Sequence, residues 1–305
     1  MTRLTPVISV VVCTRNPEPD TFARVLECLA LQTLPKDRWE LVVIDNGSKP
    51  PVVIPAVDGL PKCRLIAEPT PGIAAARVRG IREAAGELLV FVDDDNLLDP
   101  DYLENAVRIA DSFPQLGAFG GRITADGDLR LPSWLEPFRS HLALAECDRD
   151  EWALRAGESV VVPYGAGLCV RRAAALHWAT DAGCATRREK LNNRPGALRV
   201  SEDDDLVMTC LDQGLGAGRF RALHLQHVIQ ASRLGYAYQR RLARDIGYSY
   251  GRLLALRGRS SRGRRMIALG KTVLAFLGVK HRGRTRKLDV AYHYGYWRGL
   301  CSDCS

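Results

Sequence analysis

Residues 86–95 read Gly-Glu-Leu-Leu-Val-Phe-Val-Asp-Asp-Asp, an apolar run that ends in three consecutive acids. A continuous apolar run of this length is typical of a strand that is buried on both faces of a parallel sheet. In open parallel sheets the carboxyl ends of the strands line the ligand crevice, so we expect the three acids to face a ligand. Side chains alternate along an extended segment, which places Asp93 and Asp95 on one side and Asp94 on the other.

Two carboxylates on one side, with water and phosphate oxygens completing the coordination shell, suit Mg²⁺ or Mn²⁺. The alternative is a solvated turn that leads into the helix expected after Pro100. Three adjacent acids repel one another unless a cation or solvent compensates their charge. Because these acids directly follow a buried strand, the sequence favours a cation site at Asp93–Asp95.

The flanking sequence alternates between strands and helices. Apolar β-branched runs predict strands at residues 7–14, 39–45 and 63–66, and helical spacing predicts helices at residues 20–31 and 72–85. Strands separated by helices form right-handed βαβ units in a parallel sheet. The prediction is a mostly parallel sheet flanked by helices, an α/β domain over residues 1–234, and a basic helical region over residues 235–305. Further along the chain we expect helices at 99–113 and 203–213, strands at 116–123 and 219–229, and a mobile loop at 180–200.

The composition excludes several classes of protein. The 305 residues are 46% apolar and 26% charged, which is ordinary globular composition and excludes a disordered or fibrous chain. No uninterrupted apolar run approaches the roughly 18 residues that a membrane span needs. The nine cysteines are an odd number and lie in apolar stretches, which favours reduced thiols in a cytoplasmic protein. Cys301 and Cys304 form a terminal Cys-x-x-Cys pair, but with His293 they supply only three metal ligands, so a frayed dithiol is favoured over a zinc site.

The formal net charge of +8 is concentrated in the C-terminal region. Between Arg240 and Lys287, fifteen Lys and Arg face one acid, which gives +14 there and leaves −6 for all other residues. Residues 266–279 contain one charged side chain, Lys271, and as a helix they extend about 21 Å, short of the roughly 30 Å of a hydrocarbon core. We expect this segment to dock peripherally on the inner face of the membrane, with its cations among anionic headgroups. The alternative is a helix packed on the protein body with solvated basic flanks.

Two further acidic positions are candidates for a site. Asp45 ends an apolar strand, and its carboxylate could accept hydrogen bonds from a nucleobase or ribose, or it could cap its own turn. Four acids, Glu202–Asp205, begin a predicted helix, and the helix dipole explains only one or two of them. A further carboxylate could act as a general base if it faces the same crevice as Asp93–Asp95.

Seven short motifs, each weak by itself, follow one another with domain-like spacing. With them the chain resembles the inverting family 2 nucleotide-sugar glycosyltransferases of the GT-A fold, from about residue 7 to about residue 233. This resemblance implies a Rossmann-like nucleotide-binding half. The motifs are Val-Val-Cys-Thr14-Arg15-Asn16, Ile44-Asp45-Asn-Gly-Ser48, Gly72-Ile-Ala-Ala-Ala-Arg77, the 86–95 segment, Gly165-Ala-Gly167, Glu202-Asp203 and His227.

The resemblance implies a role for each matched residue. It implies that Asp203, in the Glu202-Asp203 pair, deprotonates the acceptor hydroxyl, and that Gly165 and Gly167 lie beside the acceptor. Asp95 and His227 would hold the divalent metal, Mg²⁺ or Mn²⁺, on the donor diphosphate. The donor-binding residues would be Thr14, Arg15, Asn16, Asp45, Arg77, Asp93 and Asp94, with Asp45 at the base, Asp93 at the ribose and Arg77 at the base or diphosphate.

The sequence also departs from the family pattern. Arg15 stands where relatives often carry a Tyr that stacks on the base, and Val78 stands where an Asn is usual. Residues 186–199 are rich in Arg and Asn and replace the Gly-Phe-Asp-Glu pattern before Glu202. Because that segment often shapes the acceptor site, the sequence leaves the sugar, the nucleobase and the acceptor open.

The function expected from the resemblance is metal-dependent transfer of a sugar to a hydroxyl acceptor, either lipid-linked or a cell-surface glycan. One alternative is a sugar nucleotidyltransferase, but such enzymes need a glycine-rich basic loop after the first strand, and residues 14–17 do not form one. A Rossmann oxidoreductase is excluded because no Gly-x-Gly-x-x-Gly follows that strand. A nucleic-acid-binding module that uses the basic tail is the other alternative. The acidic body and the lack of a nucleic-acid motif argue against it, so no specific nucleic acid is expected.

Overall fold

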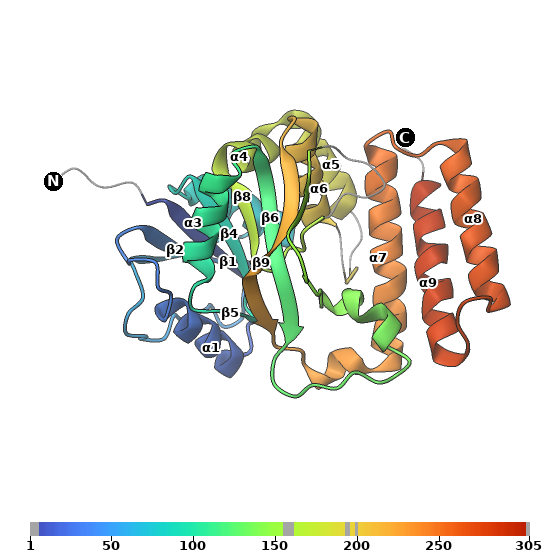
Figure 1. Cartoon of the computed structure of the whole chain (residues 1–305), viewed down its shortest axis with the longest axis horizontal. Coiled ribbons are helices and arrows are strands. Elements are labelled where there is room, and N and C mark those ends of the chain that lie inside the picture. The colour runs from blue at the N-terminus through green and yellow to red at the C-terminus, as the bar shows by residue number, and fades with distance from the viewer. Residues whose placement is uncertain (1–5, 155–161, 193–195, 199–200, 303–305) are drawn as a thin grey trace. The chain divides into compact units, whose positions relative to one another are not determined.

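The alternation of strands and helices expected for the first hundred residues is present (Figure 1). The computed structural model describes residues 6–154, 162–192, 196–198 and 201–302. The chain forms two compact units. The first comprises Met1–Gly127, Ala143–Cys184 and Leu206–Val228, and the second comprises Asp128–Leu142, Ala185–Asp205 and Ile229–Ser305. The expected domain boundary after Leu234 stays a prediction.

All strands of the described residues belong to one sheet in the first unit, in the order β3-β2-β1-β4-β8-β6-β9-β5, with β7 paired to β9. Four strands are parallel neighbours: β1 (Ile8–Thr14), β2 (Trp39–Asp45), β3 (Cys63–Ala67) and β4 (Leu88–Asp93). The others are β5 (Asn96–Leu98), β6 (Leu116–Ala125), β7 (Glu151–Ala153), β8 (Leu168–Arg171) and β9 (Gly216–His227). The sheet is mixed, because β8 runs antiparallel to both β4 and β6.

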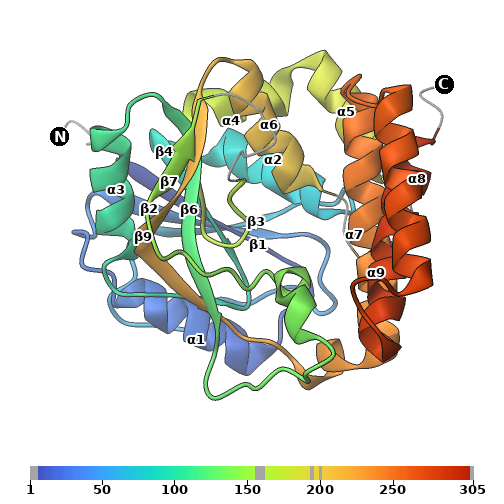
Figure 2. The same ribbon diagram turned by 45° about the vertical axis from the view of Figure 1, so that its right-hand side comes forward.

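Helices cover both faces of this sheet, which confirms the predicted α/β class. On one face, α2, α4 and the part of α6 from Leu206 onward share an apolar core with alternate residues of β1, β2 and β4. In Figure 2, α1 lies across the sheet from α2 and buries Phe22, Val25, Leu26 and Leu29. The helices are α1 (Pro19–Ala30), α2 (Ile73–Glu83), α3 (Tyr102–Ser112), α4 (Arg172–Thr180) and α6 (Glu202–Asp212).

The expected mobile loop at residues 180–200 is wrong over most of its length, because Ala182–Asn192 forms helix α5. The segment has no apolar stripe, which is the signal that the sequence prediction used. Its Ala, Arg, Glu and Lys residues nevertheless have high helix propensity. Asp181 starts the helix, since its Oδ1 accepts a hydrogen bond of 2.8 Å from the backbone N–H of Cys184. Propensity and a cap together are therefore enough for a helix at this position.

The second unit contains three long helices, α7 (Tyr236–Leu256), α8 (Arg262–Leu277) and α9 (Gly283–Leu300). This confirms a basic helical C-terminal region. In Figure 1, α9 lies between α7 and α8. Two short 3-10 helices, η1 (Glu136–Leu142) and η2 (Ala231–Leu234), belong to the same unit. In the described ranges no helix combines the length and the apolar content of a membrane span.

Helices α7 and α9 approach each other through paired glycines. A Cβ on Gly247 would lie 2.1 Å from the carbonyl oxygen of Tyr292, and a Cβ on Gly295 would lie 2.2 Å from that of Arg244. Gly251 and Gly299 repeat this arrangement one turn further on. Small residues four positions apart let helix backbones come into direct contact. The spacing Gly-x-x-x-Gly in both helices therefore determines how closely they pack.

Candidate active site

The carboxyl ends of three parallel strands meet at one edge of the sheet. In the strand register, Thr14 of β1 lies opposite Asp45 of β2, and Cys13 lies opposite both Ile44 of β2 and Asp93 of β4. The predicted donor-binding residues of the three strand ends are therefore neighbours. Arg15 follows β1 directly and is exposed.

The three acids after β4 do not form an extended segment. Strand β4 ends at Asp93, Asp94 and Asp95 form a turn, and β5 begins at Asn96. The expected alternation, with Asp93 and Asp95 on one side, is therefore wrong, because it requires extended backbone. Instead each of the three carboxyl groups has a different side-chain partner.

Asp94 turns toward β1, where the hydroxyl of Thr14 donates a hydrogen bond to its Oδ2. Burial, and then the neighbouring carboxylates of Asp95 and Asp93, raise the pKa of Asp94 to about 6 against the opposing effect of the Thr14 hydroxyl. A raised pKa means that the surroundings of this carboxyl group destabilise its ionised form. A cation bound at the turn would stabilise the ionised form, because its positive charge would compensate the charge of all three acids.

Asp95 turns toward β9, and its Oδ2 lies 3.1 Å from Nε2 of His227. The imidazole is buried, with 5% of the side chain exposed. The amide of Asn96 donates to Oδ1 of Asp95 at 3.1 Å, while its Oδ1 accepts from the backbone N–H of Asp93 at 3.2 Å. Asn96 is 1% exposed and thus holds the acidic turn in shape. The sequence analysis considered only a solvated turn after the three acids and so missed this role of Asn96.

Asp93 faces the buried Arg77 of α2. Nη2 of Arg77 lies 4.0 Å from Oδ1 of Asp93, and the guanidinium lies over the ring of Phe91 at 5.5 Å from its centroid. Arg77 is 4% exposed, whereas the side chain of Asp93 is 39% exposed. The arrangement brings together two residues that the sequence assigned to donor binding, with the carboxylate on the accessible side.

The carboxylate of Asp45 serves its own turn. Its Oδ1 accepts from the backbone N–H of Ser48 at 2.9 Å and its Oδ2 from that of Val52 at 3.0 Å. Burial raises its pKa, but these hydrogen bonds and the Ser48 hydroxyl outweigh burial and hold the pKa below its usual value. The capping interpretation of Asp45 thus has direct geometric support. A contact between Asp45 and a base stays a prediction.

Asn16 and Asn46 connect the loops around this edge. The backbone N–H of Asn16 donates to the Ser48 hydroxyl at 2.8 Å, and its side-chain oxygen accepts from the N–H of Lys49 at 2.8 Å. Asn46 accepts from the N–H of Gly72 at 2.8 Å, at the residue that precedes α2. Asn46 therefore fixes the start of the helix that carries Arg77. Sequence analysis assigned no role to Asn46, so this contact was missed.

The two glycines expected beside the acceptor belong to the same unit. Gly167 has a φ of +68°, and a Cβ there would lie 2.4 Å from the hydroxyl oxygen of Tyr102. That hydroxyl donates to the carbonyl oxygen of Gly167 at 2.6 Å. Internal packing therefore requires glycine at 167, independently of any acceptor. Gly165 is buried just before it, and its carbonyl accepts from Leu168 at 3.3 Å.

The acids that begin α6 belong to the second unit. Glu202 and Asp203 are 8% and 5% exposed, and Oδ1 of Asp203 accepts from the backbone N–H of Asp204 at 3.0 Å. Asp205 is fully buried, and its Oδ1 binds Arg257 at 2.5 Å and Arg187 at 3.1 Å. One of the four acids thus serves to anchor α6 to two arginines. Asp203 keeps the helix N-terminal position that the sequence predicted.

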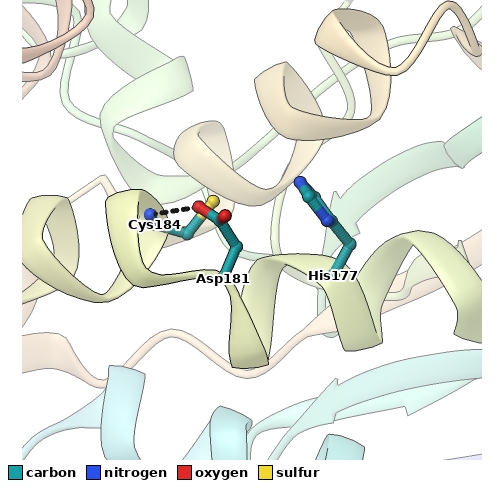
Figure 3. A group of neighbouring side chains, drawn as sticks. All are labelled: His177, Asp181 and Cys184. Atoms are coloured by element: carbon teal, nitrogen blue, oxygen red, sulfur yellow. Dashed lines mark hydrogen bonds between the residues drawn. The ribbon is translucent and has the colours of Figure 1, made fainter.

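A separate group lies at the junction of α4 and α5. Candidate ligand atoms of His177, Asp181 and Cys184 lie within 4.8 Å of one another (Figure 3). The hydrogen bond between Asp181 and the Cys184 N–H caps α5, which accounts for this carboxylate without a metal.

Of the expected Cys-x-x-Cys pair, Cys301 ends α9 and Cys304 lies outside the described residues.

The sheet order, the acidic turn after β4 and the helices on both faces define a GT-A architecture. One solved structure with this fold is the mannosyltransferase PcManGT from Pyrobaculum calidifontis, in complex with GDP-Man and Mn²⁺. It has a TM-score of 0.51 and 17% sequence identity over 96% of this chain and 70% of that chain. At this identity the similarity shows the fold. Residues 9–173, more than half of the chain, match the model of glycosyl transferase family 2, and the chain therefore belongs to that family.

Curated relatives match over shorter segments. Glycosyltransferase AglE of Haloferax volcanii is 33% identical over 113 residues, which are 35% of this chain and 36% of that protein. Glucosyl-dolichyl phosphate glucuronosyltransferase of the same organism is 26% identical over 54% of this chain and 52% of its own length. An N-acetylglucosaminyltransferase of Sinorhizobium fredii is 27% identical over 56% and 42%. The chain thus spans from about a third to about half of the length of these relatives.

Proposed function

We propose that this chain transfers a sugar from a nucleotide-diphosphate donor to a hydroxyl acceptor, with inversion at the anomeric carbon and with Mg²⁺ or Mn²⁺. The observation that carries the proposal is the Asp93–Asp95 turn at the end of the parallel strands, beside a buried His227, in a chain of glycosyl transferase family 2. A sugar nucleotidyltransferase has less support. The family match describes glycosyl transfer, and residues 14–17 contain no glycine.

The residues of the turn fit a divalent cation. Carboxylate oxygen and imidazole nitrogen at 3.1 Å form a mixed donor pair, which suits Mn²⁺ in particular. The raised pKa of Asp94, caused by burial and then by its two acidic neighbours, is a further sign of uncompensated negative charge. Asp95 and His227 would hold the ion. When bound, the ion stabilises negative charge on the leaving diphosphate.

The donor would lie at the ends of β1, β2 and β4. The side chain of Asp93, at 39% exposed, is more accessible than that of Asp95, at 28%, and would bind the ribose hydroxyls, since an ionised carboxylate accepts hydrogen bonds. Arg77 would bind a phosphate oxygen through its planar guanidinium. Thr14, together with Asp94, would line the pocket near the turn. Three residues of the β1 and β2 loops, Arg15, Asn16 and Asp45, would surround the base.

The proposed reaction is a single displacement. The acceptor oxygen forms a bond to the anomeric carbon while the bond from that carbon to the diphosphate oxygen breaks, and the acceptor proton passes to the carboxylate of Asp203. An acid at a helix N-terminus is kept ionised by the helix dipole and can accept this proton. Glu202, the neighbouring acid, would support the same site, and Gly165 and Gly167 would lie on the acceptor side.

The acceptor in this proposal is lipid-linked or membrane-borne. The name of one relative, glucosyl-dolichyl phosphate glucuronosyltransferase, refers to a lipid-linked sugar. The basic C-terminal region of this chain also suits work at the inner face of an anionic membrane.

Calorimetry tests the role of the cation directly. A screen of UDP- and GDP-sugars for thermal stabilisation with Mn²⁺ first identifies the donor by mass action. Asp95→Asn should then weaken Mn²⁺ binding by at least about tenfold, since loss of even an outer-shell partner of a metal ligand costs that much. The matched control is Asp99→Asn, because Asp99 forms a similar pair with His224 at 2.8 Å. Unchanged donor affinity in excess chelator would refute metal dependence.

A further inference from the structure

Helix α8 has an inverted burial pattern. Its buried residues are the small Ala268 and Ala275, which are 1% and 4% exposed. The exposed large apolar residues of α8 and the turn after it are Met266 (65%), Ile267 (64%), Val273 (49%), Leu274 (51%), Phe276 (63%), Leu277 (66%) and Val279 (69%). A surface helix of a globular protein normally shows the reverse, with large apolar residues buried and polar residues outside.

The exposed apolar residues form a continuous stripe. Met266, Gly270, Val273, Leu274 and Leu277 follow the i, i+3, i+4 spacing of one helix face. Ala268 and Ala275, seven residues apart, lie on the face that is buried in the unit. Gly270 has no atom within 4 Å of the position of a Cβ, which also places the stripe on an open surface. Contiguous apolar patches on soluble surfaces mark interaction sites.

The surroundings of the stripe are strongly cationic. Exposed basic residues lie within the stripe (Lys271) and on both sides of it in the sequence: Arg262, Arg264, Arg265, Lys280, Arg282, Arg284 and Lys287. Residues 246–288 contain no Asp or Glu, so no carboxylate of this segment neutralises them. One further cation, Arg286, covers the ring of Phe276 at 5.7 Å from its centroid.

We propose that α8 inserts its apolar stripe into the surface of an anionic lipid bilayer, with the flanking cations among the phosphate groups. Charge complementarity selects this occupant. A second copy of the chain would place these eight cations against eight others, and a nucleic acid would leave seven large apolar side chains in water. α8 has 16 residues and extends about 24 Å, so it lies in the interface and does not span the bilayer.

This inference extends the proposed function, since it gives the enzyme a position beside a membrane-borne acceptor. Its test needs no turnover. The full chain is mixed with vesicles of phosphatidylcholine alone or of phosphatidylcholine with the anionic lipid phosphatidylglycerol, which attracts basic segments, and bound protein is recovered by flotation. The apolar variant is Leu274→Ser with Leu277→Ser, and its matched control is Leu31→Ser, a leucine that is 67% exposed in the first unit.

The full chain and the Leu31→Ser control should float with anionic vesicles and much less with neutral ones. The double variant should lose binding by about tenfold or more, because it removes two inserted leucines. Lys271→Glu should weaken binding more at low salt than at high salt. Equal flotation of the double variant and the control would overturn insertion, as would binding of RNA in preference to vesicles or a dimer that the double variant abolishes. Loss of donor binding in any variant would bear on the proposed function instead.

Discussion

Replacing Gly247 with Ala should destabilise the second unit, although alanine is the better helix former. Gly247 lies within α7, and a Cβ at this position would lie 2.1 Å from the carbonyl oxygen of Tyr292 and 2.9 Å from the N–H nitrogen of Tyr296 on α9. Both are backbone atoms, so no side chain can rotate away to make room. The helices must move apart, and the glycine contacts at 251, 295 and 299 would loosen with them.

Two opposing contributions give the magnitude. Alanine gains about 1 kcal/mol over glycine inside a helix. Inserting a methyl group into a tight contact costs about 1–3 kcal/mol and sometimes more. The clash is with backbone, and the distance is about 1 Å shorter than any normal carbon–oxygen contact, so the upper end of that range applies. We therefore expect a net loss of about 2 kcal/mol in the free energy of unfolding.

The chain offers a matched control in Gly270 of α8, where a Cβ would meet no atom within 4 Å. Gly270→Ala should gain the helix propensity without the clash and stabilise the protein by about 1 kcal/mol. Urea unfolding followed by circular dichroism would measure both variants against the natural chain. A Gly247→Ala midpoint equal to or above that of Gly270→Ala would refute the close approach of α7 and α9.

Three further predictions concern charged groups. In chelating buffer, Asp94 should contribute a falling slope to stability as the pH rises from about 4 to about 6, because its pKa rises from 3.8 in the unfolded chain to about 6 in the folded one. This shift corresponds to about 3 kcal/mol, and Asp94→Asn should remove the slope in urea unfolding at each pH. Arg257→Leu should cost about 3 kcal/mol or more, because it leaves a buried carboxylate of Asp205 short of a partner, whereas Arg149→Ala in an exposed pair should cost far less. Equal losses would contradict this. Asp203→Asn should leave donor binding unchanged and lower kcat by about 10²–10⁴-fold, and a product that retains the donor configuration would contradict single displacement.

The sequence predicted the parts of the fold where periodicity and burial agree. The apolar run 88–92 gave β4 because a strand buried on both faces has no polar alternation, and the following acids gave the edge of the sheet where ligands bind. The predicted alternation of side chains was wrong at Asp94, because it assumes an extended backbone and the chain turns there. Local pattern predicts where a strand ends, but the geometry after its last residue depends on the buried Asn96, which bonds to both Asp93 and Asp95.

Long-range pairs were beyond the reach of the pattern. Asp95 and His227 are 132 residues apart, and only the pairing of β5 with β9 brings Asn96 opposite His227. The resemblance to a family proposed this pair, because a motif carries positional information that periodicity lacks. The role of Asn46 at the start of α2 had no comparable signal, since an Asn in a turn cluster usually bonds only to its own turn.

The glycine pairs and the exposed apolar stripe on α8 both follow from the use of small residues where the helices of the second unit pack together. Helices α7 and α9 meet through glycines such as Gly247 and Gly295, and α8 buries only Ala268 and Ala275. These helices therefore bury little apolar area and gain stability from close backbone packing instead. The large apolar side chains of α8 are then not needed in this interior and lie outside. In water, the exposed apolar side chains contribute nothing to the free energy of folding and favour aggregation. At a lipid surface the same arrangement would be favourable, because the exposed apolar side chains of α8 would be buried among the acyl chains and the packing inside the unit would not change.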